Sequence, residues 1–131
     1  MTRVLDASAL FAYLEGEEGH EKITKAFTRS IETDKRLLMC SVNWGEVYYV
    51  LARKYGLEES AEYMALIDTF PIDIIPADRE ITRQAAMLKA EHALPYADSF
   101  AAALAKLRKG DLITADMDFK KIESEIKIEW I

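Results

Sequence analysis

The fold is decided by one stretch near the amino terminus, Val4-Leu5-Asp6-Ala7-Ser8-Ala9-Leu10. It predicts a short apolar strand that ends in an aspartate, followed by a turn of small residues and a helix. In a chain whose strands alternate with helices, an aspartate after a strand lies at the edge of the sheet where such folds bind their ligands. The stretch therefore predicts an α/β fold with a polar site that includes Asp6.

The size and composition of the chain fit one folded domain. The chain has 131 residues, of which 50% are apolar, so a core can form and we expect residues 1–131 to be a single domain. Cys40, within an apolar run, is the only cysteine, which excludes an internal disulfide and disfavours a cysteine-based zinc site. With no signal peptide and no apolar run long enough to cross a bilayer, we expect a cytoplasmic protein without a membrane partner.

The net charge of -6 is unusual for a protein that contacts nucleic acid. Either the partner is not a polyanion, or the acids gather in one place and are neutralised by something bound there. The basic residues form small groups, which hint at contacts with backbone phosphates.

Strands and helices alternate along the chain. Strands are predicted at 2–5, 37–40, 72–75, 111–114 and around 126–130. Helices are predicted at 8–15, 21–31, 43–55, 59–70, from Asp78, and from Asp98 to Gly110, with a helical turn at 118–122. In the second helix, Ile23, Phe27 and Ile31 are expected to share a buried face. This order predicts an α/β/α sandwich around a mostly parallel sheet of about five strands.

Four acids occupy the places where strands give way to helices: Asp6, Glu46, Asp98 and Asp116. In a parallel sheet these places share one edge, so the carboxylates converge and raise one another's pKa. A hard cation relieves the repulsion, and Mg²⁺ or Mn²⁺ prefers such oxygen ligands. The chemistry indicated is hydrolysis of a phosphodiester by a water molecule that the metal activates.

Each acid also has a structural interpretation. Asn43 with Glu46 three residues later fits a capping box at a helix start, and Asp98 or Asp116 alone makes a good N-cap. Asp118 is interpreted as a local cap of the Phe119 turn. The metal-site interpretation depends on the coincidence of all four acids.

Polar neighbours and other side chains complete the expectations. Four residues close to the acids in sequence are expected to support the site: Ser8, Asn43, Ser99 and Thr114. His20 and His92 are expected to face solvent. Tyrosines of the helices at 43–55 and 59–70, with Met64, are expected to form core or an oligomer face.

Four segments together resemble the PIN domain family, and more narrowly its VapC toxins. They are Val4-Leu5-Asp6-Ala7-Ser8-Ala9-Leu10, Ser41-Val42-Asn43-Trp44-Gly45-Glu46-Val47, Leu94-Pro95-Tyr96-Ala97-Asp98-Ser99-Phe100 and Leu112-Ile113-Thr114-Ala115-Asp116-Met117-Asp118-Phe119. The resemblance covers essentially the whole chain. It implies a Mg²⁺- or Mn²⁺-dependent endoribonuclease, a homodimer held inactive by a VapB-type antitoxin, with Asp6, Glu46, Asp98 and Asp116 as the acidic quartet. Ser8 and Thr114 match the family's supporting hydroxyls.

Three alternatives remain at this stage. A non-enzymatic signalling module of receiver type also gathers acids around Mg²⁺, but it requires a lysine after a late strand, where this chain has Thr114-Ala115-Asp116. A phosphatase with an aspartyl nucleophile requires an acid at position 8, which is Ser8. A binding or structural module would use the acids only as caps.

Overall fold

A five-stranded, wholly parallel sheet forms the centre of the molecule. The computed structural model describes residues 1–131. The strands are β1 (Arg3–Leu5), β2 (Leu37–Cys40), β3 (Ile72–Ile75), β4 (Asp111–Thr114) and β5 (Ile128–Trp130). Their order is β3-β2-β1-β4-β5, and every neighbouring pair is parallel. The predicted α/β fold with a sheet of about five strands is confirmed, and the sheet is entirely rather than mostly parallel.

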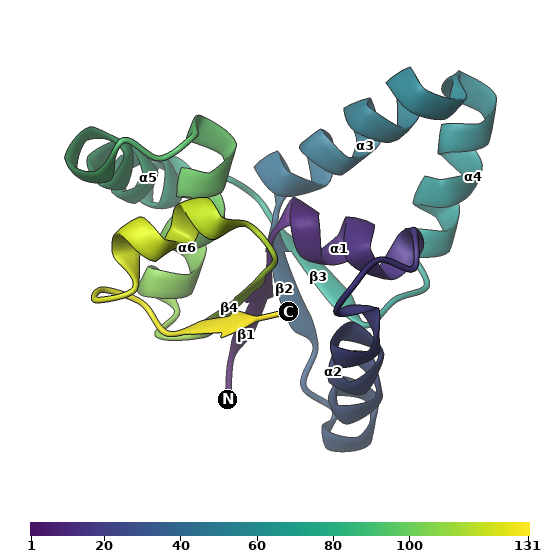
Figure 1. The fold of residues 1–131 in the computed structure, drawn as a ribbon, viewed down its shortest axis with the longest axis horizontal. Helices are drawn as coiled ribbons and strands as arrows, with labels where there is room; N and C mark the ends of the chain where they lie inside the picture. Colours follow the sequence, from purple (N-terminus) through teal and green to yellow (C-terminus); the bar gives the residue numbers. More distant parts are fainter.

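Helices cover both faces of the sheet. They are α1 (Ala7–Leu14), α2 (His20–Thr33), α3 (Ser41–Tyr55), α4 (Leu57–Ile67), α5 (Arg79–His92), α6 (Tyr96–Leu107) and the 3₁₀ helix η1 (Met117–Ile122). Figure 1 shows α5 and α6 on one side of the strands and α1 to α4 on the other. None of these helices combines the length and apolar character needed to span a membrane.

Alternating strand residues build two hydrophobic cores. Val4 and Leu112 face α5, α6 and η1, whereas Leu5 and Ile113 face α1, α2 and α3. Side chains that alternate along a strand point to opposite faces of the sheet, and all four are buried. The alanine run of α6, Ala101–Ala105, is fully buried and lets this helix lie close to the sheet.

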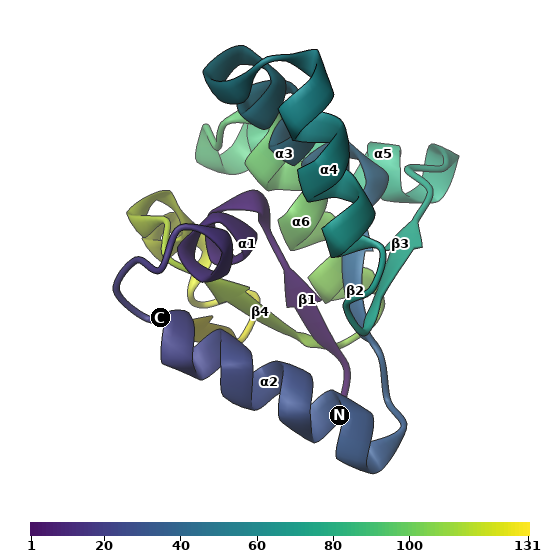
Figure 2. The ribbon, with the colours of Figure 1, turned by 90° about the vertical axis from the view of Figure 1, so that its right-hand side faces the viewer.

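One sequence expectation about burial is corrected by the structure. Ile31 of α2 is 70% exposed, whereas Ile23 and Phe27 are buried as expected. The aromatic residues of α3 and α4 divide between both expected roles: Tyr55 stacks on Tyr63 between the helices, while Tyr49 is 52% exposed. Figure 2 shows α2 running across the lower part of the molecule, with α3 and α4 above it.

Candidate active site

The four predicted acids come from four elements that meet at the carboxyl edge of the sheet. Asp6 follows β1 and caps α1, Asp98 lies in the first turn of α6, and Asp116 follows β4 and caps η1. Glu46 lies in the second turn of α3, not in the first as expected, because α3 begins at Ser41. In Figure 1, α1 and α3 begin beside each other above the centre of the sheet.

Asp6 is held by hydrogen bonds that join β1 to β4. Its Oδ1 accepts from Ser8 Oγ at 2.7 Å and from the backbone N–H of Ala9 at 2.9 Å, and its Oδ2 accepts from Thr114 Oγ1 at 2.5 Å. Thr114 Oγ1 in turn accepts from the backbone N–H of Asp116 at 2.9 Å. The predicted supporting hydroxyls of Ser8 and Thr114 therefore fix the carboxylate of Asp6 and the backbone of Asp116 in one network.

Asn43 fixes the start of α3 against the start of α6. It is fully buried, and its Nδ2 donates to the carbonyl oxygen of Ala97 at 3.0 Å. The Asn43–Glu46 capping box is wrong, since Cys40 occupies the N-cap position of α3. Asp98 is not an N-cap either, because Pro95 holds that position in α6. Two of the structural interpretations of the acids therefore fail.

The remaining supporting residue, Ser99, does not hydrogen-bond an acid. Its buried hydroxyl donates to the carbonyl oxygen of Pro95 at 3.1 Å. Ser99 therefore closes the first turn of the helix that carries Asp98.

Asp118 joins the cluster, contrary to its interpretation as a cap. Carboxylate oxygens of Asp98, Asp116 and Asp118 lie within 4.8 Å of one another. Asp116 is the cap of η1, with Oδ1 accepting from the backbone N–H of Asp118 at 2.9 Å. The spacing of Asp116 and Asp118 in the sequence does not reveal the 3₁₀ helix η1, which places both carboxylates on the same side. For this reason the sequence alone does not predict that Asp118 belongs to the site.

The electrostatics of the cluster follow from burial and mutual repulsion. Burial, followed by the charge of Asp116, raises the pKa of Asp98 to about 8. Burial raises the pKa of Asp6 to about 6, although the hydrogen bonds from Thr114, Ala9 and Ser8 lower it. Burial and the charge of Asp116 also raise the pKa of Glu46. Burial is thus the largest cause of the raised pKa at each of these three carboxyl groups, and repulsion from Asp116 adds to it.

Several oxygen atoms of the site are buried without a hydrogen-bond donor. They are Oε1 of Glu46, Oδ2 of Asp98 and Oδ1 of Asn43. Buried polar atoms are almost always paired, so these three acceptors fit a bound cation. All of the candidate metal ligands are oxygen atoms, which suit Mg²⁺ or Mn²⁺ rather than a soft metal.

The histidines lie outside this cluster, in different surroundings from each other. The side chain of His20 is 42% exposed beside Glu21, with Nε2 and Oε1 3.2 Å apart. His92 is half-buried against Glu125, 33 positions further along the chain, so the expectation that it faces solvent is wrong.

A parallel sheet flanked by helices, with acids at its carboxyl edge, defines a class of α/β proteins that bind ligands at that edge. A family model described as "PIN domain" matches residues 3–125. The chain belongs to the PIN domain family.

Solved structures of toxin–antitoxin proteins share this fold. DNA-bound VapBC from Salmonella typhimurium matches with a TM-score of 0.78 and 18% identity over 98% of this chain and 97% of the other. VapBC2 from Rickettsia felis, bound to a promoter DNA fragment, matches with 0.76 and 16% over 98% of each chain. VapC20 from Mycobacterium tuberculosis, a toxin that cleaves the sarcin–ricin loop, matches with 0.67 and 14% over 91% and 93%. Among curated protein sequences, none matches this chain.

Proposed function

We propose that this chain is a Mg²⁺- or Mn²⁺-dependent endoribonuclease, the toxin of a type II toxin–antitoxin pair of the VapBC kind. One observation carries the proposal: acids from four separate elements gather at one edge of the sheet, and buried carboxylate oxygens of Glu46 and Asp98 have no donor. Membership of the PIN domain family supports it.

Asp6, Glu46, Asp98 and Asp116 are the residues that would hold the metal, and Asp118 lies beside Asp98 and Asp116. A bound Mg²⁺ or Mn²⁺ activates water and stabilises charge on a phosphoryl oxygen. Asp6 supplies a fixed carboxylate because Ser8 and Thr114 hold both of its oxygens. Asn43 keeps Glu46 and Asp98 at a set separation by joining α3 to the first turn of α6, which carries Asp98.

The pairing with an antitoxin is part of the proposal. VapBC complexes are among the structures that share the fold. A basic side chain of a VapB-type partner is the group that would best enter the acid cluster, because charge-assisted hydrogen bonds to carboxylates are strong. It would exclude the metal and so prevent cleavage.

A homodimer is proposed from the outer surface of α3 and α4. Tyr49 of α3 is 52% exposed and Leu66 of α4 is 49% exposed, and large apolar side chains on neighbouring helices are typical of protein interfaces. Sedimentation of the purified chain measures this directly, and a monomer at micromolar concentration would contradict it.

Isosteric variants test the proposed activity. Glu46→Gln and Asp98→Asn are expected to reduce cleavage of RNA at least a hundredfold and to weaken Mn²⁺ binding in calorimetry. The matched controls are Glu58→Gln on α4 and Asp78→Asn at the cap of α5, which leave the acid cluster intact. Full cleavage by either cluster variant, or cleavage by the wild type in excess EDTA, would refute a metal-dependent nuclease.

A further inference from the structure

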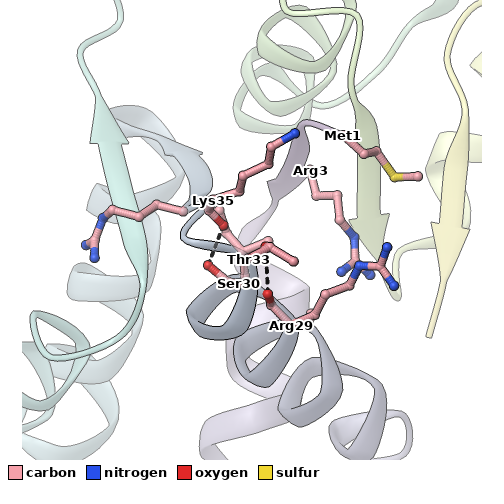
Figure 3. A pocket seen from close by; sticks show the side chains of 9 residues that line it. Met1, Arg3, Arg29, Ser30, Thr33 and Lys35 are labelled. Carbon is pink, nitrogen blue, oxygen red and sulfur yellow. Dashed lines mark hydrogen bonds between the residues drawn. The ribbon is translucent and has the colours of Figure 1, made fainter.

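A second charged region lies at the opposite edge of the sheet, where β1 and β2 begin. A cavity of about 120 Å³ there is lined by Arg3, Arg29, Lys35 and Arg36, with Met1, Ser30 and Thr33. Figure 3 shows the guanidinium groups of Arg3 and Arg29 beside each other and the ammonium group of Lys35 above them. The acids of the candidate active site follow the other ends of the strands, so the two regions lie on opposite edges of the sheet.

Two of the cations in this cavity have no acidic partner. Arg29 and Lys35 form none of the ion pairs of the structure, although the chain has six more acids than bases. Their positions bring like charges together, because Lys35 lowers the pKa of the Met1 amino group and Arg29 lowers it further. Gathered cations of this kind attract an anion for the reason that gathered acids attract a metal.

The other two arginines are held in place by carboxylates. Arg3 donates from Nε and Nη2 to Glu129, with Nη2–Oε2 at 2.6 Å, which leaves Nη1 free to bind another acceptor. Arg36 donates to Asp73 at 2.6 Å and to the carbonyl oxygen of Ile72 at 3.0 Å. Arg3 is thus held at the cavity with unused N–H donors, and Arg36 forms part of the cavity wall.

Carbonyl oxygens near the carboxyl end of α2, beside the cavity, have hydrogen-bond donors other than the charged groups of Arg29 and Lys35. The carbonyl oxygen of Ser30 accepts from the backbone N–H of Lys35, and that of Arg29 accepts from Thr33 Oγ1. The charged ends of Arg29 and Lys35 are therefore available to a ligand.

We propose that this cavity binds a phosphate group through Arg3, Arg29 and Lys35. Guanidinium forks match the oxygens of phosphate, and an ammonium adds a point charge. A cavity of this volume has room for one small anion. A second hollow of about 360 Å³ shares Arg3 and Arg29 and is also lined by Asp111, Lys127 and Ile128. It offers room for the rest of a nucleotide, so the phosphate belongs either to a free nucleotide or to an RNA backbone.

Calorimetry with inorganic phosphate and with 5′-adenosine monophosphate tests the proposal on the full chain. Arg29→Gln/Lys35→Gln is expected to weaken binding at least tenfold. The control Lys25→Gln/Arg83→Gln removes the same charge from exposed cations of α2 and α5 outside the cavity and is expected to change binding less than twofold. Equal losses of affinity in both double variants, or no binding of either probe to the wild type, would overturn the proposal.

A substitution that is expected to strengthen phosphate binding distinguishes a change at the cavity from simple unfolding of a variant. Glu129→Gln removes a negative charge from the rim, while its amide oxygen can still accept a hydrogen bond from Arg3, so phosphate is expected to bind more tightly. Unchanged or weaker phosphate binding in a folded Glu129→Gln variant would contradict the assigned role of Arg3.

The source of the phosphate is decided by binding of a short single-stranded RNA in EDTA, with no cleavage involved. If the ligand is an RNA backbone, Arg29→Gln/Lys35→Gln lowers the slope of log affinity against log salt by about 0.7 for each phosphate that the variant no longer neutralises. If only inorganic phosphate and the mononucleotide bind more weakly to the variant, the ligand is a free phosphate compound. The measurement does not require the chain to be a nuclease, so its outcome is separate from that of the proposed function.

Discussion

Replacing Asp98 with asparagine is expected to stabilise the metal-free protein while it removes activity. The carboxyl group of Asp98 is buried among Asp116, Asp6 and Glu46, which together with burial raise its pKa from 3.8 to about 8. Below about pH 3 it is protonated in the folded and the unfolded chain alike and contributes nothing to their difference. As the pH rises towards 8 the unfolded chain ionises first, so the free energy of unfolding falls.

The size of this effect follows from the raised pKa. The pKa of Asp98 is raised by roughly four pH units, and about three of these lie below pH 7. Each unit is worth about 1.4 kcal/mol, so the loss in free energy of unfolding at pH 7 has an upper limit of about 4 kcal/mol. Because Asp116 and Asp118 are half-buried and solvent screens part of the repulsion, we expect Asp98→Asn to gain about 2 kcal/mol. At roughly 4 °C per kcal/mol, the melting temperature rises by about 8 °C.

Thermal unfolding in EDTA at pH 4, 6 and 8 measures this gain. It should be small at pH 4, grow up to pH 8, and shrink when Mn²⁺ is added to both proteins, since the metal stabilises only the intact cluster. Asp78→Asn is the control, because Asp78 caps α5 through Ile81 and asparagine caps a helix about as well. A gain that is equal at pH 4 and pH 8, or a loss of stability at pH 7, would refute the repulsion argument.

Four further measurements test the site. Thr114→Val removes the donor to Asp6 Oδ2 and should cost about 1–3 kcal/mol in urea unfolding; a change below about 0.5 kcal/mol would mean that this hydrogen bond contributes little to the fold. Asn43→Ala breaks the link to Ala97 and should lower both stability and RNA cleavage, whereas unchanged cleavage would separate Asn43 from the site. Asp118→Asn should weaken Mn²⁺ binding less than Asp98→Asn does, because Asp118 is 45% exposed and lies 3.8 Å from Lys121; the reverse order would make Asp118 a principal ligand. Millimolar Mg²⁺ should raise the melting temperature of the wild type by binding the folded state alone, and a flat response would argue against the cluster as a metal site.

The architecture and the meeting of the acids follow from short-range patterns in the sequence. Apolar strands that end in polar residues fix β1 and β4, and a parallel arrangement then brings Asp6 and Asp116 to one edge. The capping-box pattern of Asn43 and Glu46 misled because a buried asparagine that joins two helices looks the same in sequence as an N-cap.

Long-range packing and helix geometry explain the other differences. Ile31 lies eight residues after Ile23, and at 100° per residue it is rotated by about 80° from that side chain, which turns it out of the core. His92 meets Glu125 only through the tertiary fold, and the basic cavity unites residues of β1, α2 and the loop before β2. The local spacing of residues in the sequence predicts neither the His92–Glu125 contact nor the basic cavity.

The scattering of the acid cluster along the chain bears on when it first exists during synthesis. Its members range from Asp6 to Asp118, and β4, which carries Thr114, pairs with the central strand β1. A nascent polypeptide that ends before β4 lacks one of the two neighbours of β1 and the hydroxyl that holds Asp6. The complete acid cluster therefore cannot form until residue 118 has emerged from the ribosomal exit tunnel.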